Sequence, residues 1–157
     1  MNIGIIVFSK TGNTLSVAEK LRDRLLEMGH KAALEKVTAS NDVEMDPNKI
    51  LLTNPPSTKG YDMLVFASPV YGFRLPAVMQ VYLQEIPSLE GKLAAGFVTQ
   101  AFPFPSWGGN QTIRGMEKLV QAKSGKLNAT GVVNWTFTGK RKALIAQTIE
   151  RIAAICN

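Results

Sequence analysis

Short apolar runs alternate along the chain with longer segments in which apolar residues recur at helical spacing. Residues 3–8 and 62–68 are almost continuously apolar, which is typical of strands buried on both faces of a parallel sheet. Residues 31–37 alternate more weakly, and residues 93–99 are again apolar. A fifth strand is expected over residues 127–137. There a period of two predicts one shared side for Leu127, Ala129, Gly131, Val133, Trp135 and Phe137.

Helical spacing of apolar residues predicts amphipathic helices after four of these strands. The first helix ends near Met28, because Gly29 follows where a glycine C-cap belongs. The second begins with Pro76 as its first-turn proline and ends at Pro87. Gly115 lies inside the third helix, where glycine costs roughly 1 kcal/mol against alanine, so we expect close packing there. The fourth helix is expected to bury Ile145, Ile149, Ile152 and Cys156.

Residues 38–60 interrupt the alternation of strands and helices. They contain Pro47, Pro55 and Pro56 and are expected to hold at most a short turn that begins at Asp46. Elsewhere the alternation predicts a parallel sheet with helices on both faces and right-handed crossovers. Ligands of such sheets bind beyond the carboxyl ends of the strands. The loops after the first, third and fourth strands of this sheet are therefore the candidate site.

Composition limits the chemistry that the side chains can supply. The chain has 157 residues, of which 45% are hydrophobic and 19% charged, and we expect one soluble domain over residues 1–157. Its single cysteine, Cys156, forms no disulfide within the chain, and a single histidine, His30, disfavours Ser-His-Asp chemistry and multi-ligand zinc sites. No metal site and no catalytic acid or base are expected. Catalysis would need a reactive group that a bound molecule supplies.

The formal charge of +6 arises entirely in the C-terminal third of the chain. Residues 1–100 hold ten Lys or Arg and ten Asp or Glu, whereas residues 101–157 hold eight and two. Because no run exceeds three like charges and no aromatic residues alternate with them, solvated helix faces are favoured over a nucleic-acid site. An acidic partner or an anionic cosubstrate is the alternative. No targeting segment or membrane helix is evident, so we expect a cytoplasmic protein.

The loop after the first strand, residues 9–14, carries the sharpest chemical signal. It offers three hydroxyl groups and several backbone N–H groups at the start of a helix, which suits a terminal phosphate. It matches neither the dinucleotide-binding nor the triphosphate-binding glycine motif. The alternative is an ordinary turn, since Ser, Thr and Asn favour turns.

This loop, Ser9-Lys10-Thr11-Gly12-Asn13-Thr14, resembles the T/S-x-T-G-N-T phosphate loop of the flavodoxin-like proteins, which bind FMN. Ser68-Pro69-Val70-Tyr71-Gly72-Phe73 is similar to the S/T-P-V-Y-G segment of flavodoxins and of NAD(P)H-dependent FMN and quinone reductases. The resemblance covers the whole chain in element order. It implies a three-layer flavodoxin-like α/β fold whose five-stranded parallel sheet has the order 2-1-3-4-5.

The resemblance also implies which residues contact the cofactor. The FMN phosphate is expected on Ser9, Lys10, Thr11, Gly12, Asn13 and Thr14. The isoalloxazine ring is expected beside Pro69, Val70, Tyr71, Gly72 and Phe73, with its far side beside Thr99, Gln100, Ala101 and Phe102. Aromatic side chains of these loops suit stacking on a planar ring, although packing within the loop is the alternative for Phe104 and Trp107.

Two redox functions follow from the resemblance. The first is a flavoprotein of electron transport that carries electrons through tightly bound FMN to a redox partner protein. The alternative is an oxidoreductase, an NAD(P)H-dependent FMN or quinone reductase, in which Arg74 and Arg114 bind the cosubstrate phosphate. A nucleotide-free binding module fits the fold but leaves the phosphate loop unexplained. The uncharged residues 100–109 and the basic helix beside them depart from the acidic surface of flavodoxins.

Overall fold

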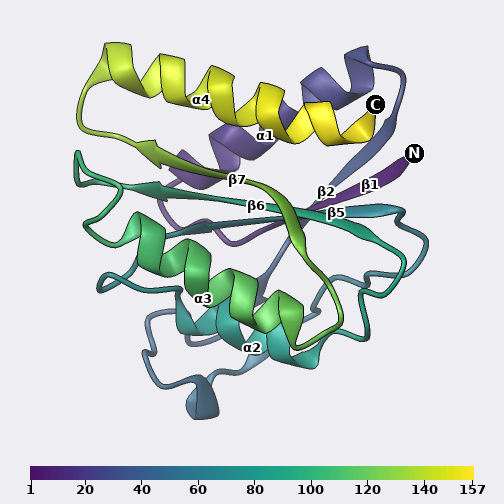
Figure 1. The fold of residues 1–157 in the computed structure, drawn as a ribbon. Coiled ribbons are helices and arrows are strands. Elements are labelled where there is room, and N and C mark those ends of the chain that lie inside the picture. Colours follow the sequence, from purple (N-terminus) through teal and green to yellow (C-terminus); the bar gives the residue numbers. More distant parts are fainter.

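The computed structural model describes residues 1–157 and contains a five-stranded parallel sheet between two layers of helices (Figure 1). The order β2-β1-β5-β6-β7 is the expected 2-1-3-4-5, so the predicted fold class is confirmed. All neighbouring strands are parallel. The strands are β1 (Asn2–Val7), β2 (Lys31–Lys36), β5 (Met63–Pro69), β6 (Leu93–Gln100) and β7 (Leu127–Asn134).

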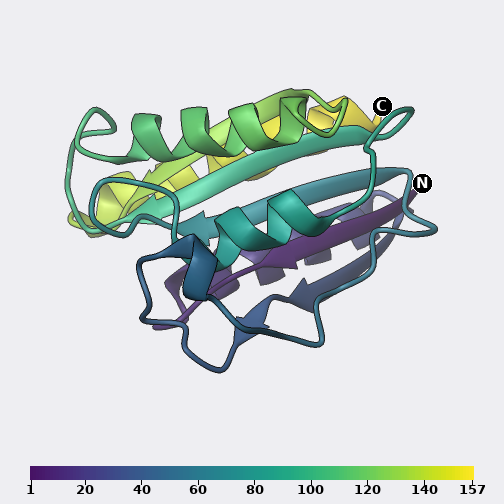
Figure 2. The same cartoon turned by 90° about the horizontal axis from the view of Figure 1, so that it is seen from below.

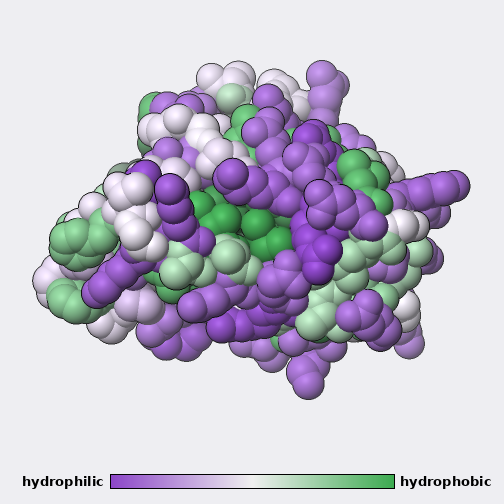
Figure 3. Space-filling model, turned by 90° about the horizontal axis from the view of Figure 1, so that it is seen from above, coloured by the Kyte–Doolittle hydropathy of each residue, from purple (hydrophilic) through white to green (hydrophobic).

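The helices lie on both faces of the sheet. One face carries α1 (Asn13–Glu27), α4 (Thr138–Ala153) and the 3-10 turn η2 (Ala154–Cys156), and the other carries α2 (Ala77–Glu85) and α3 (Gly109–Gln121). The outer surface over α1 and α4 is mostly hydrophilic (Figure 3). Each of the four α-helices therefore buries one face against the sheet and leaves the other in water.

Two hydrophobic cores, one on each face of the sheet, explain the continuous apolar runs. Ile3, Ile5 and Val7 of β1 pack in the core beneath α1 and α4, whereas Ile6 packs in the core beneath α2 and α3. Successive side chains of a strand point to opposite faces, so a strand covered on both sides needs apolar residues at nearly every position. The expected apolar face of α4 is confirmed, with Ile149 and Ile152 buried and Ile145 and Cys156 packed against the same core.

Helix ends agree with the sequence to within a few residues. Gly29 has φ 86° just beyond α1, the left-handed conformation expected of a glycine that ends a helix. Pro76 lies just before α2 and is not the expected first residue of that helix.

The expectation of close packing at Gly115 is wrong, because a Cβ there would meet only Leu75 Cβ, at 3.9 Å. Gly115 instead lies beside an open groove between α2 and α3.

The last strand differs from its predicted form in two ways. Its pairing with β6 shifts register at Ala94 and Ala95, and Leu127 consequently packs in the core beneath α2 and α3 while Ala129 packs in the opposite core. A bulge places one extra residue in a strand and so reverses the alternation beyond it. The strand also ends at Asn134, and Phe137 is 55% exposed just before α4.

Residues 38–60 form an excursion beyond the sheet edge (Figure 2). The expected turn is the 3-10 helix η1 (Pro47–Lys49), where the carboxylate of Asp46 accepts the backbone N–H of Asn48. A small antiparallel ladder of β3 (Thr38–Ala39) and β4 (Leu52–Thr53) was not predicted, because two-residue strands are too short to show a periodic pattern in the sequence. None of the helices has the length and apolarity that a membrane crossing requires.

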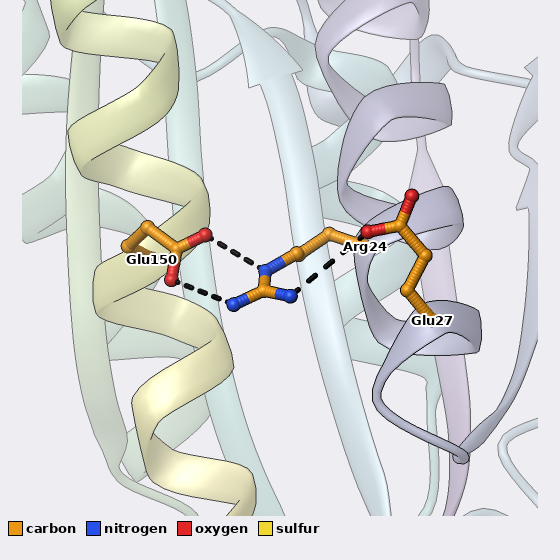
Figure 4. A network of polar contacts seen from close by, with 3 residues as sticks. All are labelled: Arg24, Glu27 and Glu150. Atoms are coloured by element: carbon orange, nitrogen blue, oxygen red, sulfur yellow. Dashed lines mark hydrogen bonds and ion pairs between the residues drawn. The ribbon is translucent and has the colours of Figure 1, made fainter.

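An ion-pair network ties α1 to α4 on the outer surface (Figure 4). Arg24 donates from Nε to Glu150 Oε1 at 2.8 Å and from Nη2 to Oε2 at 3.2 Å, and its Nη1 lies 3.9 Å from Glu27 Oε2. The hydrogen bonds from Arg24 hold the pKa of Glu150 below its ordinary value of 4.5. The bidentate pair is exposed and therefore only supplements the shared core beneath α1 and α4, which holds the two helices together.

Substitution of Gly131 tests the close packing of α4 on β7. A Cβ at Gly131 would fall on the buried side chain of Thr148, so Gly131→Ala should lower the free energy of unfolding by about 1–3 kcal/mol. Gly139, in the first turn of α4, has nothing within 4 Å of its Cβ position. Gly139→Ala is the matched control and should raise stability by up to about 1 kcal/mol. Urea unfolding of both variants measures the difference, and equal stabilities would contradict the packing.

Acid titration tests the pair of Arg24 and Glu150. A carboxyl whose pKa is lowered by folding contributes stability above its unfolded pKa and loses it as the pH falls through the folded pKa. Glu150→Gln should therefore reduce the loss of stability below pH 4.5, measured by urea unfolding over a pH series. Glu19→Gln, at an exposed position of α1 without an ion pair, is the control. Identical acid profiles for the two variants would contradict the assignment.

Candidate functional site

The loops after β1, β5 and β6 open at the carboxyl edge of the sheet, as expected for parallel strands. A cavity of about 460 Å³ lies there. Seven of the predicted site residues line it: Thr11, Asn13, Pro69, Val70, Thr99, Gln100 and Ala101. The structure therefore brings the three predicted loops together around one cavity of a size typical for a small-molecule cofactor.

The phosphate loop presents its backbone as a set of donors. Gly12 has φ 94° and immediately precedes α1, and Ser9 Oγ accepts the N–H of Leu15 at 3.3 Å. The N–H groups of residues 10–14 donate to no acceptor in the chain. Successive free N–H groups at the N-terminus of a helix favour an anion, since the helix dipole adds positive potential there. The residues present thus fit a phosphate group.

The hydroxyl of Thr14 lies beneath this loop rather than inside it. Thr14 is 1% exposed, and its Oγ1 lies 2.7 Å from Thr99 Oγ1 at the end of β6. Both hydroxyls find their hydrogen-bond partner in each other, so the bond joins the first loop to the fourth strand of the sheet. Only the backbone N–H of Thr14 is then free for a ligand.

Ser9, Lys10 and Gly12 line a second cavity, of about 220 Å³, on the side of the loop that faces β2. Lys10 Nζ lies 3.1 Å from Asp42 Oδ1, in the excursion that follows β2. The two side chains are each about 40% exposed. Five of the six predicted phosphate-loop residues are therefore divided between two neighbouring cavities, Thr14 lines neither, and Lys10 is held toward the acidic segment.

The loop after β5 makes a tight reversal. Tyr71 N–H donates to Arg74 O at 3.0 Å and Arg74 N–H donates back at 3.1 Å, with φ values of 54° at Gly72 and 62° at Phe73 between them. Positive φ at both central residues is typical of a type I′ turn, and it is a strained conformation for a bulky residue such as Phe73. Burial, and after it the Asp42 carboxylate, raises the pKa of Tyr71. The turn projects Phe73 toward the third loop.

The third loop is held by the side chain of Gln100. Its Nε2 donates to Phe102 O at 3.0 Å, Phe104 O at 2.7 Å and Asn134 Oδ1 at 2.8 Å, and Asn134 Nδ2 donates to Pro103 O at 2.6 Å. Gln100 is 5% exposed, and its Oε1 has no partner. The side-chain amide of Gln100 therefore holds the backbone of residues 102–104 against the end of β7. Gln100 also lines the cavity.

Four aromatic side chains, here called the aromatic cluster, join the second and third loops. Phe73 and Phe102 stack with centroids 5.4 Å apart and planes 6° apart, and Trp107 meets the edges of Phe102 at 6.1 Å and Phe104 at 4.9 Å. The backbone of Gly108 fits against Phe73, where a Cβ would approach Phe73 Cα to 3.1 Å. Phe73 and Phe102, predicted to flank the ring, thus contact each other, and with Tyr71 and Gly72 they lie beyond the residues that line the larger cavity.

Trp135 and Thr136 also line the larger cavity, although neither residue was predicted to belong to the site. They follow β7, and Thr136 Oγ1 donates to Ala101 O. The Arg141 guanidinium lies 4.9 Å from the ring of Trp135 and donates to its carbonyl at 3.1 Å. The expected strand order already placed the end of the last strand beside the fourth, so this signal was present in the sequence.

Comparison with known proteins bears on the fold. No protein-family model matches the sequence, and no curated protein matches it. The flavodoxin of Streptococcus pneumonia TIGR4 is similar with a TM-score of 0.68 at 17% identity, covering 99% of both chains. Oxidised Flavodoxin 2 from Bacillus cereus gives 0.67 at 18% identity, covering 98% of this chain and 99% of that chain. A flavoprotein in complex with FMN from Lactobacillus acidophilus NCFM gives 0.61 at 16% identity, covering 83% and 92%.

These likenesses span 83% to 99% of the chain, while the sequence identities lie below 20%. Structural similarity at such low sequence identity shows a shared arrangement of strands and helices. It does not show a shared function, because function depends on the particular residues of a site. The sheet order and the full-length superposition agree with the resemblance that the first two loops indicated. The chain therefore has the flavodoxin-like fold.

Proposed function

We propose that this chain binds FMN at the carboxyl edge of its sheet and acts as an electron carrier. The observation that carries the proposal is the row of free N–H groups of residues 10–14 at the start of α1, beside the cavity of about 460 Å³. A structure solved with FMN is among the proteins of similar fold. A terminal phosphate matches these donors, and a planar ring matches the apolar loops next to them.

The residues of the chain have separate roles in this proposal. The N–H groups of residues 10–14 and the hydroxyl of Thr11 hold the phosphate, while Pro69, Val70 and Thr99 contact the rest of the cofactor. FMN, when bound, supplies the redox chemistry, which the side chains of the chain do not provide. The bond between Thr14 and Thr99 and the amide of Gln100 hold the loops in place, so that little reorganisation is needed on binding.

The second candidate is an NAD(P)H-dependent FMN or quinone reductase. Arg74 and Arg114 are exposed and form no ion pair, so both are free to meet the phosphate of a cosubstrate. Oxidation of NADPH with a quinone acceptor separates the two candidates. Turnover that saturates with NADPH would favour the reductase, whereas its absence in an FMN-loaded protein favours the carrier.

The first prediction concerns the cofactor itself. The purified protein, incubated with FMN and passed through a desalting column, should be yellow and release FMN on denaturation. FAD offered under the same conditions should be retained less well, because the free N–H groups suit a terminal phosphate. Absorbance spectra and chromatography of the released flavin measure both outcomes. Protein that stays colourless after incubation with FMN would contradict the proposal.

A second prediction concerns the phosphate loop. Thr11 is exposed and borders the cavity, so Thr11→Ala should remove one hydrogen bond to the phosphate and weaken FMN binding by about 1 kcal/mol, or about fivefold in Kd. Ser40→Ala, at an exposed hydroxyl outside both cavities, is the matched control and should leave Kd unchanged. Quenching of flavin fluorescence gives the two constants. Equal Kd values for the two variants would argue against this role of Thr11.

A further inference from the structure

The aromatic cluster exposes an unusual amount of apolar surface. Phe73, Phe102, Phe104 and Trp107 are 55%, 45%, 52% and 49% exposed, although they contact one another. Single exposed apolar residues are common on proteins, whereas a contiguous group of aromatic rings marks a surface that another molecule covers. Phe104 and Trp107 lie outside the residues expected to contact FMN, so the apolar surface that these two expose is free for another molecule.

A groove of about 360 Å³ between α2 and α3 continues this surface. Arg74, which directly follows Phe73, lines the groove together with Gln111 and Lys118 of α3. Gln111 Nε2 donates to Ser106 O at 2.9 Å, next to Trp107. The lack of a side chain at Gly115 keeps the groove open. The cluster and this groove together are called the cluster–groove face below.

Positive charge on this face is not neutralised within the chain. Arg74 and Lys118 line the groove and are exposed, and Lys10, Arg22 and Arg24 are the only basic residues that form ion pairs. Residues 101–108 contain no charge, and α3 contains a single acidic residue. The acidic side chains across the cavity are occupied, Asp42 by Lys10 and Glu44 by backbone N–H groups.

We propose that the cluster–groove face is the docking site of an acidic redox protein. Aromatic rings at the centre of an interface lose water on binding and supply much of the affinity, while flanking charges steer the encounter and select the partner. Unpaired arginine and lysine side chains around the rings select a partner with carboxylates. The redox character of the partner rests on the proposed FMN function, since Val70 and Ala101 of the loops that carry the cluster line the cofactor cavity. The acidic character rests on the face alone.

Charge and ring geometry disfavour the other occupants. A second copy of the chain, facing this one through a twofold axis, would place a face with unpaired Arg74 and Lys118 against an identical face that supplies no carboxylate from its groove lining. A nucleic acid would need free ring faces for its bases, but Phe73 and Phe102 are stacked on each other and Trp107 packs against two neighbours. An acidic protein requires only the exposed edges of the rings and the free cations.

Calorimetric titration with two small redox proteins of opposite charge tests the proposal. The probes are an acidic [2Fe–2S] ferredoxin and the basic cytochrome c, each added to the protein before and after loading with FMN. Ferredoxin should bind at about 20 mM salt and bind at least about tenfold more weakly at about 200 mM, because salt screens the attraction. Cytochrome c should show no binding. Tighter binding of cytochrome c, or no binding of ferredoxin at low salt, would overturn the proposal.

Paired variants locate the interaction on the cluster–groove face. Arg74→Glu with Lys118→Glu should weaken ferredoxin binding at least about tenfold. Lys31→Glu with Lys126→Glu makes the same change of charge at exposed positions at the amino ends of β2 and β7, and should have less than about a twofold effect. Phe104→Ser should weaken binding about tenfold, whereas Leu26→Ser, at a 48% exposed residue near the end of α1, should not.

The remaining outcomes separate this inference from the proposed function. Equal losses from the two charge pairs would overturn the docking site in favour of a general attraction between net charges. Vesicles of anionic phosphatidylglycerol that bind more tightly than ferredoxin, with the same dependence on Arg74 and Lys118, would overturn it in favour of a membrane surface. Protein that binds ferredoxin through the face but takes up no FMN would leave the docking site standing and refute the FMN function.

Discussion

Coverage of both faces of a parallel sheet is the constraint from which the rest of this structure follows. Parallel strands need crossovers, and three of the four crossovers here bring a helix onto one face, while α4 follows the last strand, so β1, β5 and β6 are buried on both sides. The backbone of such strands is satisfied within the sheet and leaves no polar group for chemistry. The same connectivity brings the carboxyl ends of the strands to one edge, so the loops that leave them are the part of the molecule free to bind a ligand.

Buried hydrogen bonds between side chains hold these loops in place at the carboxyl ends of the strands. Thr14 and Thr99 join the phosphate loop to β6, and Gln100 with Asn134 joins the third loop to β7. Because both contacts are shielded from water, losing one partner would leave a buried polar group unsatisfied, which costs about 1–3 kcal/mol. Thr99 and Gln100 thus both line the cavity and hold its loops, and the free N–H groups of residues 10–14 are held in place before any ligand arrives.

The excess of basic residues and the acidic residues near the cavity lie in different parts of the folded molecule. The basic C-terminal third includes Arg114 and Lys118 of α3 and the start of α4, whereas the acidic residues near the cavity lie in the excursion after β2. The loop of residues 9–14 thus carries a paired charge, whereas the second and third loops carry exposed aromatic rings next to a groove with free cations. An electron carrier with this arrangement would recognise its partner on one side of its cofactor.

The sequence by itself determined the five main strands, four helices and the hydroxyl-rich loop of residues 9–14, because these depend on local periodicity and on glycine and hydroxyl residues at fixed positions. The sheet order came from resemblance to a family through two short motifs. Only the tertiary structure decided that Leu127 and Ala129 face opposite cores, that Lys10 pairs with Asp42 and that Phe73 stacks on Phe102. Each of these contacts joins residues from different elements or depends on a bulge, and a periodic pattern within one segment carries no information about such pairings.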